Sequence, residues 1–328
     1  MENSYDIIGI GDTVIDAFIK LSVGHTQETA KGTELCLPYG AKIPFESVTV
    51  VPAVGNSANA VVSASRLGLK SAIVTFLGKD DNGQDCLERL TKEGVGTEFI
   101  TQEEGKPTNY HYVLWYGSDR TILIKHAEFV SLLPNIGSPK WLYLSSLGAH
   151  TKDLHFKIAD YKKEHPEIKL AFQPGTFQLH LKNELADLYK EVDVICMNKE
   201  EAEELLGIGG ESIKKIMDGL QALGPKTVIL TDGSLGAYMK YENTYFTMPL
   251  YPDIAEPYER TGAGDAFFST FISYLAKGYD APYAIRRAPI NSMNVVQHIG
   301  AQEGLLSEEA IEEYLKKAPA NYNLTILE

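Results

Sequence analysis

A glycine-rich stretch at positions 259–267 is the part of the sequence best suited to chemistry. It reads Glu-Arg-Thr-Gly-Ala-Gly-Asp-Ala-Phe and runs into an apolar segment with the character of a helix. Gly262 and Gly264 allow backbone conformations that other residues resist. The first N–H groups of the helix, with the positive end of its dipole behind them, would then face an anion. The pattern therefore predicts an anion site, and phosphate is the usual occupant of such a site.

The carboxylate of Asp265 stands at the edge of this predicted anion site. A carboxylate in that place would repel a bound phosphate, so its presence suggests a function that offsets this repulsion. One reason is that it takes a proton from a hydroxyl group that attacks the phosphate. The alternative is an ordinary helix start, in which Asp265 only complements the helix dipole. The residues alone leave both interpretations open.

Two further carboxylates follow an apolar run at positions 5–10, which we expect to be a central strand. Asp12 lies at the end of that run and Asp16 lies four residues further on. Carboxylates accept hydrogen bonds from neighbouring hydroxyls, so they are suitable sugar ligands, although they could equally be turn or capping residues. The adjacent Gly9-Ile-Gly11 lacks the third glycine of a dinucleotide-binding fingerprint, which argues against an NAD-dependent oxidoreductase.

Asn198 and Glu201 come directly after another apolar run, at positions 192–196. Their spacing places them on one side of a helix start. Hard oxygen ligands at the carboxyl end of a strand suit Mg²⁺, which keeps most of its water molecules. A Lys-Glu-Glu segment of this kind can also be a plain solvated first turn of a helix.

Two more segments contain polar groups at the start of elements. Gly55 initiates a predicted helix that Asn56 could cap, and Asn59 lies one turn inside, where it could face a ligand. Thr231-Asp-Gly233-Ser-Leu-Gly236 follows a predicted strand and could be a simple glycine-containing turn.

These motifs together resemble those of the ribokinase family of carbohydrate and nucleoside kinases, the PfkB family. Four of them occur in the order found in that family: Gly11-x-x-x-x-Asp16, Gly55-x-x-x-Asn59 with its Arg66-Leu67-Gly68 ending, Asn198-x-x-Glu201, and the Thr-Gly-Ala-Gly-Asp stretch. The resemblance implies transfer of the γ-phosphoryl group of ATP to a hydroxyl of a sugar. A nucleoside acceptor, or a catalytically idle member that only binds a nucleotide or sugar, remains as an alternative.

The resemblance also implies a role for each matching residue. Asp265 would be the general base, and the backbone of Gly262, Ala263 and Gly264 would form the anion hole. The acceptor would be held by a set of four residues, Asp12, Asp16, Gly55 and Asn59. Asn198 and Glu201 would order water bound to magnesium. The nucleotide would be lined by Thr231, Gly233 and Gly236, with Asn291 as a further candidate near the adenine.

The sequence departs from the family pattern at four positions, one of which is Val61 in place of an alanine in the acceptor signature. Val54 replaces the first glycine of the acceptor signature. Glu259 stands where the family has an aspartate that helps bind a monovalent cation such as potassium. Arg260 stands where a small residue is usual, and its guanidinium could do part of what that cation does. Arg260 could instead point to solvent or pair with Glu259.

The elements needed to position these residues follow a regular pattern. From position 141 onward, apolar strand-like runs alternate with helical segments, which predicts a mostly parallel sheet covered on both faces. We expect one ribokinase-like domain over 1–328, a three-layer α/β/α sandwich. The segments at about 13–51 and 108–126 do not fit the alternation, and we expect them to form a small β lid. Among the closing helices we expect one over 281–296, and an earlier helix over 181–189.

Composition narrows the possible partners and the compartment. A net charge of −14 argues against nucleic acid, and no apolar run approaches the length of a membrane span. The first residues do not have the pattern of a secretory signal. Three scattered cysteines fit a reducing cytoplasm. Because an exposed β lid favours pairing, we expect a homodimer formed through the lid.

Overall fold

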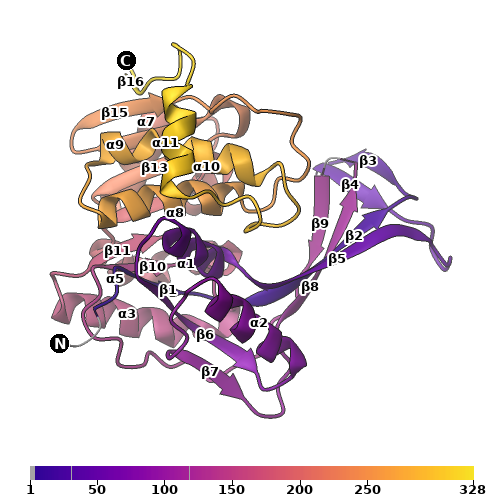
Figure 1. The fold of residues 1–328 in the computed structure, drawn as a ribbon. Coiled ribbons are helices and arrows are strands. Elements are labelled where there is room, and N and C mark those ends of the chain that lie inside the picture. Colours follow the sequence, from indigo (N-terminus) through magenta and orange to yellow (C-terminus); the bar gives the residue numbers. More distant parts are fainter. Residues whose placement is uncertain (1–3, 31, 118) are drawn as a thin grey trace.

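The computed structural model describes residues 4–30, 32–117 and 119–328, and its largest feature is a ten-stranded sheet. Figure 1 shows helices packed on both faces of this sheet and a smaller sheet that projects to one side. The strand order of the large sheet is β16-β15-β14-β13-β12-β11-β10-β1-β6-β7. The expected three-layer α/β/α arrangement is confirmed.

The large sheet is mostly parallel. Its parallel strands are β1 (Ile7–Ile10), β6 (Ser71–Gly78), β7 (Ile100–Glu103), β10 (Trp141–Leu144), β11 (Lys169–Phe172), β12 (Val194–Asn198) and β13 (Thr227–Thr231). Antiparallel strands extend it at one edge: β14 (Ala237–Tyr241), β15 (Thr244–Met248) and β16 (Thr325–Ile326). Because parallel strands end at one edge, the loops that follow them gather there.

Successive side chains along the strands point to opposite faces of the sheet and pack into two separate hydrophobic cores. Ile8 and Leu144 point to a core with α3 (Lys152–Glu164), α5 (Ala186–Glu191), α6 (Lys199–Leu206) and α7 (Ile213–Ala222). Ile7 and Tyr143 point to the opposite core, with α1 (Asn56–Arg66), α8 (Ala263–Ala276), α9 (Ala281–Ile285), α10 (Ala288–Val295) and α11 (Glu308–Lys316). Helix α2 (Asp81–Lys92) packs beside α1 in a third, smaller cluster.

The small sheet contains four strands in the order β5-β2-β8-β9. They are β2 (Val14–Leu21), β5 (Phe45–Val54), β8 (Tyr110–Tyr116) and β9 (Asp119–Leu123), and a separate hairpin of β3 (His25–Thr29) and β4 (Gly32–Cys36) lies in the same part of the chain. Strand β5 runs from the small sheet almost directly into α1. The small sheet is thereby connected to the start of the helix that bears Asn56 and Asn59.

Two expected helices are interrupted. The helix expected over 181–189 is instead α4 (Thr176–Leu181), a 3-10 turn and α5, because Lys182 adopts a φ of 42° that ends α4. The helix expected over 281–296 divides into α9 and α10, and Pro289 lies in the first turn of α10, where its missing N–H costs nothing. Within the described ranges, no helix is long and apolar enough to cross a membrane.

Candidate active site

Two cavities meet at the start of α8. The larger has a volume of about 750 Å³ and the smaller about 220 Å³. Four residues line both of them, namely Thr231, Arg260, Ala263 and Gly264. A ligand that extends from the smaller cavity into the larger one would therefore pass the first turn of α8.

The first turn of α8 has free backbone donors. Its N-cap is Gly262, with a left-handed φ of 80°, and no side chain caps the helix. A Cβ atom on Gly262 would lie 2.3 Å from the Cβ of Ala301, so the position requires glycine. Gly262, Ala263 and Gly264 all line the larger cavity. The uncapped N–H groups and the helix dipole would attract an anion to this corner of the cavity.

Asp265 lies beside this corner and is held by three side-chain amides. Its Oδ1 accepts hydrogen bonds from Asn56 Nδ2 at 2.8 Å and from Gln173 Nε2 at 2.9 Å, while its Oδ2 accepts one from Asn59 Nδ2 at 2.7 Å. The residue is 8% exposed and lines the larger cavity. A carboxylate has about four lone-pair positions, so three donors leave one for a ligand hydroxyl.

The amide of Gln173 has a defined orientation. Its Oε1 accepts a hydrogen bond from the hydroxyl of Tyr143, which is fully buried. Burial raises the pKa of Tyr143 well above its usual value, and the nearby charge of Asp265 raises it further, so the hydroxyl keeps its proton. Because the carboxylate of Asp265 can only accept, the NH₂ group of Gln173 faces it, and the Gln173 oxygen is left to accept from Tyr143.

Asp12 and Asp16 line the same cavity as Asp265, and each lies beside a histidine. His126 Nδ1 is 2.9 Å from Asp12 Oδ2, and His111 Nδ1 is 3.5 Å from Asp16 Oδ1. The two histidine rings contact each other edge to face, with centroids 5.4 Å apart. This end of the cavity offers both acceptors and donors, which is the combination that a polyhydroxyl ligand requires.

Gly55 allows the small-sheet side of the cavity to approach the large sheet. Its φ is 119°, and a Cβ there would lie 2.4 Å from the backbone oxygen of Asp12. The close approach places α1 so that Asn59 reaches Asp265. The expectation that Asn56 caps α1 is wrong, because the N-cap is Gly55 and the Asn56 amide donates to Asp265 instead.

Asn198 and Glu201 form a reciprocal capping box at the start of α6. Asn198 Oδ1 accepts from the Glu201 N–H at 2.7 Å, and Glu201 Oε2 accepts from the Asn198 N–H at 2.9 Å. Both residues also line the larger cavity. Burial, and to a lesser degree neighbouring acidic groups, raises the pKa of the Glu201 carboxyl. A cation in the cavity would compensate that charge, so the pair fits a magnesium ion held through its water molecules.

The smaller cavity is lined by Thr231, Gly233 and Gly236. Asn291 does not line it: its side chain is fully buried, donates to Thr270 Oγ1 at 2.8 Å and accepts from the Leu306 N–H at 2.9 Å. The NH₂ group and the oxygen of the amide both have partners inside the core, so the expectation that Asn291 contacts the nucleotide is wrong. The neighbouring residues Ser292 and Met293 line the cavity in its place.

Glu259 is 2% exposed and faces the small sheet. Its Oε1 accepts hydrogen bonds from the backbone N–H of Thr261, at 2.8 Å, and from the Thr261 hydroxyl. Arg120 in β9 places its Nε 3.4 Å from the same oxygen. Arg260 is exposed and lines both cavities. The arginine that pairs with Glu259 in the described chain is thus Arg120 rather than Arg260.

Several cavity residues were missed by reasoning from the sequence: Asn56, His111, Arg120, His126 and Gln173. Gln173 follows β11 directly, and side chains after parallel strands are where ligands bind in such sheets, so its position was a usable signal. His111 and Arg120 lie on strands of the small sheet, where no local pattern separates a ligand contact from an ordinary strand residue.

Comparison with known proteins identifies the family. The model of the pfkB family carbohydrate kinases matches residues 21–308. The ribokinase of Bacillus subtilis (strain 168) is 27% identical over 287 residues, which cover 84% of this chain and 92% of that protein. A nucleoside kinase of Methanocaldococcus jannaschii is 22% identical over 268 residues, which cover 80% of this chain and 85% of that protein.

A solved structure shows the same fold. The putative ribokinase II from E. coli, in complex with ATP and Mg²⁺, aligns with a TM-score of 0.75 at 19% identity, over 96% of this chain and 99% of that one. The family match extends over most of the sequence and includes the start of α8, its glycines and Asp265. The chain belongs to the pfkB family of carbohydrate kinases.

Proposed function

We propose that the protein transfers the γ-phosphoryl group of ATP to a hydroxyl group of a sugar. The observation that carries the proposal is the position of Asp265, which lies beside the uncapped start of α8 and lines the cavity that contains Asp12 and Asp16. A hydroxyl bound near those carboxylates and a phosphoryl group at the helix start would both be within reach of one base.

The acceptor would be held at the small-sheet end of the larger cavity. Asp12 and Asp16 would accept hydrogen bonds from its hydroxyls, and Asn59 and the backbone at Gly55 would border it. Asp265 would take the proton of the attacking hydroxyl, using the lone pair that its three amide partners leave free. The amides hold the carboxylate in position for that step.

The nucleotide would occupy the smaller cavity, with its phosphates directed toward the start of α8. Thr231, Gly233 and Gly236 would border it, and Arg260 lies where the two cavities join. The N–H groups from Gly262 to Gly264 would stabilise negative charge on the transferring group. Asn198 and Glu201 would orient magnesium-bound water, and bound magnesium would neutralise charge on the phosphates.

We further propose that the small sheet acts as a lid and as a dimer interface. As a lid, it would exclude water, so that ATP is not hydrolysed. One face of the sheet exposes a row of apolar side chains across paired strands: Val48, Val50, Tyr112 and Leu123. A second copy of the chain would cover that face. The three cysteines are free, which supports a reducing compartment such as the cytoplasm.

The test is an ADP-release assay with ATP and magnesium over a panel of sugars and nucleosides. Release that depends on one sugar class supports the proposal. Release with nucleosides alone would favour the second candidate, a nucleoside kinase, for which Ile122, Phe177 and the 750 Å³ cavity provide an apolar wall and room. Binding of ATP without turnover on any acceptor would indicate a catalytically idle protein and contradict the proposal.

A further inference from the structure

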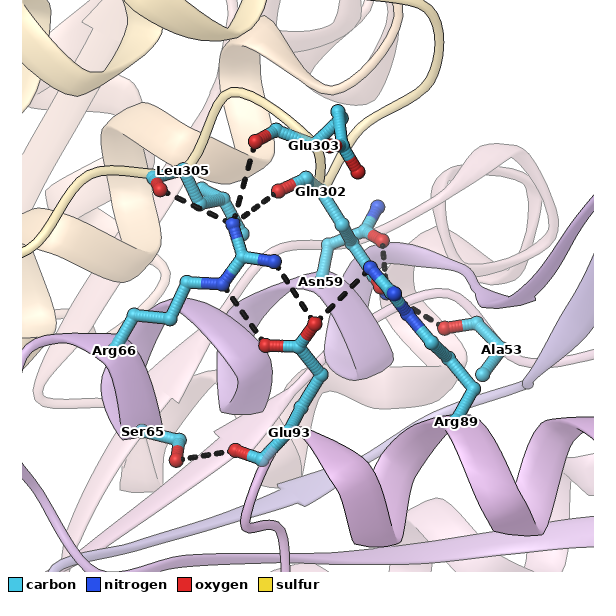
Figure 2. A network of polar contacts seen from close by, with 9 residues as sticks. All are labelled: Ala53, Asn59, Ser65, Arg66, Arg89, Glu93, Gln302, Glu303 and Leu305. Atoms are coloured by element: carbon cyan, nitrogen blue, oxygen red, sulfur yellow. Dashed lines mark hydrogen bonds and ion pairs between the residues drawn. The ribbon is translucent and has the colours of Figure 1, made fainter.

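We propose that Gln302 is a positioning residue for the phosphoryl transfer, because it fixes the amide orientation of Asn59 and thereby the donor that faces Asp265. This inference rests on the proposed function. Gln302 is 1% exposed and lies in the loop after α10, outside both cavities. Figure 2 shows its side chain between Asn59 and Ala53. Gln302 would therefore affect the reaction without touching a substrate.

The chain of hydrogen bonds between Ala53 and Asp265 allows only one orientation of each amide. Gln302 Nε2 donates to the backbone oxygen of Ala53 at 2.6 Å and to Asn59 Oδ1 at 3.1 Å. A backbone oxygen can only accept, so the NH₂ group of Gln302 must face it. The oxygen of Asn59 must then face Gln302, and the NH₂ group of Asn59 is left to donate to Asp265, at 2.7 Å.

The reverse orientation of Asn59 is disfavoured at both ends. A flipped amide would place its NH₂ against the NH₂ of Gln302 and its oxygen against the carboxylate of Asp265. Donor would face donor and acceptor would face acceptor, in a site where Asn59 is only 4% exposed and water cannot compensate. Gln302 donates to the oxygen of Asn59 as Tyr143 donates to the oxygen of Gln173, so each amide is hydrogen-bonded behind the NH₂ group that faces Asp265.

The same NH₂ group also holds the junction between the small sheet and α1. Ala53 is near the end of β5 and has a φ of 61°, a left-handed conformation that costs a non-glycine residue about 1 kcal/mol or more. Its N–H donates to Cys86 Sγ at 3.3 Å, and its oxygen accepts from Gln302. Gln302 thus connects the base of the small sheet to the orientation of Asn59.

The backbone that carries Gln302 is held independently of its side chain. Arg66 Nη1 donates to the backbone oxygens of Gln302 at 2.6 Å and Leu305 at 3.1 Å. The remainder of the guanidinium forms a two-pronged pair with Glu93, at 2.9 Å for both contacts, as Figure 2 shows. Substitution of the Gln302 side chain should therefore leave the course of the loop intact.

The experiment is a double-mutant cycle in kcat, made of Gln302→Met, Asn59→Ala and the double variant. Methionine has a similar length and no donor. We expect Gln302→Met to lower kcat by about 10- to 100-fold, because a misaligned base loses that much. The KM for ATP should change by less than about twofold, since Gln302 is remote from the smaller cavity. In the Asn59→Ala background, the same substitution should have almost no further effect on kcat.

Asn294→Ala is the matched control. Asn294 Nδ2 donates to the backbone oxygen of Gly304 at 2.7 Å, so the variant loosens the same loop without touching Asn59. We expect it to lower the melting temperature as Gln302→Met does, with kcat retained. An equal loss of kcat in the control, or independent losses for Gln302 and Asn59, would overturn the inference while leaving the kinase activity established. Absence of turnover by the wild-type protein on every acceptor would overturn the proposed function, and the inference with it.

Discussion

Arg120 of the small sheet, which lines the larger cavity, forms an ion pair with Glu259 of the segment before α8, with Nε 3.4 Å from Oε1. A second contact lies alongside it, between the rings of Trp115 and Tyr258, whose centroids are 5.0 Å apart. The two contacts join the small sheet to the residues that lead into the anion site. The backbone of Thr261 donates to the same oxygen of Glu259, and Thr261 directly precedes Gly262. A shift of Arg120 that moves Glu259 would therefore also move the start of α8.

The Arg120–Glu259 pair predicts a link between the small sheet and catalysis. We expect Arg120→Met to lower the melting temperature, because it leaves the 2% exposed carboxylate of Glu259 without its cationic partner. The variant should also release more ADP in the absence of acceptor, because the lid would close less often. Adding Glu259→Gln should restore the melting temperature and leave the excess ADP release. If the double variant recovered both the melting temperature and the low ADP release of the wild type, the proposal that the small sheet acts as a lid would be contradicted.

The position of Arg260 predicts how the enzyme responds to monovalent cations. Arg260 lines both cavities beside the first turn of α8, so its charge is available to the phosphates without an added cation. We expect the wild-type protein to turn over in potassium-free buffer, and Arg260→Met to raise the KM for ATP by about tenfold. The measurement is a set of ATP titrations with and without potassium. A strict requirement of the wild-type protein for potassium would show that Arg260 does not have this role.

Asp265→Asn tests the proposed base. We expect kcat to fall by about 10³-fold or more, because positioned general bases typically contribute 10²- to 10⁴-fold. The affinity for ATP should be retained or increase, since the variant removes a negative charge beside the anion site. Steady-state kinetics give kcat, and isothermal titration calorimetry gives the affinity for ATP. Turnover close to that of the wild type would mean that another group accepts the proton.

Glu201 predicts opposite effects on stability and on activity. The pKa of its carboxyl is higher in the folded protein than in the unfolded chain, where it is about 4.5. The neutral group therefore contributes its stability below pH 4.5, and that contribution is lost as the pH rises through the folded pKa. At pH 7 the ionised group therefore destabilises the fold. Glu201→Gln keeps the capping box, and we expect a melting temperature about 2 °C higher at pH 7.

The higher melting temperature of Glu201→Gln should disappear below pH 4.5, where the glutamate of the wild type and the glutamine of the variant are both neutral. Phosphoryl transfer at limiting magnesium should be weaker in the variant, because the carboxylate that would orient magnesium-bound water is absent. A variant that is no more stable than the wild type at pH 7 would contradict the argument from burial.

The exposed face of the small sheet predicts the oligomeric state. We expect a dimer in light scattering at micromolar concentration and a monomer for Tyr112→Glu, because a charge in the middle of an apolar interface has no partner. Lys20→Gln, on another part of the small sheet, changes the net charge by the same amount as Tyr112→Glu and is the control. A wild-type protein that is monomeric at every concentration would contradict the dimer.

The sequence predicted the large sheet well because its strands are short, apolar runs separated by helices. The start of α8 was predictable from Gly262, Gly264 and Asp265, since one local segment contains both the turn and the carboxylate. Asn291 was misplaced because a buried polar residue in a helix looks the same whether it faces a ligand or a core hydroxyl such as that of Thr270. Its partner lies 21 positions away on another helix, which no local pattern reveals.

The partners of Asp265 could not be predicted for a similar reason. Asn56 reaches it from 209 positions away and Gln173 from 92. Whether Asn56 caps its own helix or crosses to another depends on Gly55, which orients the start of α1 toward α8. The hairpin of β3 and β4 escaped notice because both strands are polar and exposed, so they lack the apolar alternation that marks a strand.

The smaller cavity is lined by residues from the last third of the chain, whereas the larger cavity also contains residues from near the beginning of the chain. All four residues expected to hold the acceptor lie before position 60, whereas every residue of the smaller cavity lies between 231 and 296. Under the proposed function, substitutions that alter the acceptor need not touch the residues that would border the nucleotide. Mutational libraries aimed at a new sugar should therefore combine positions in the first 130 residues with Phe177, which also lines the larger cavity, and can leave residues 231–296 unchanged.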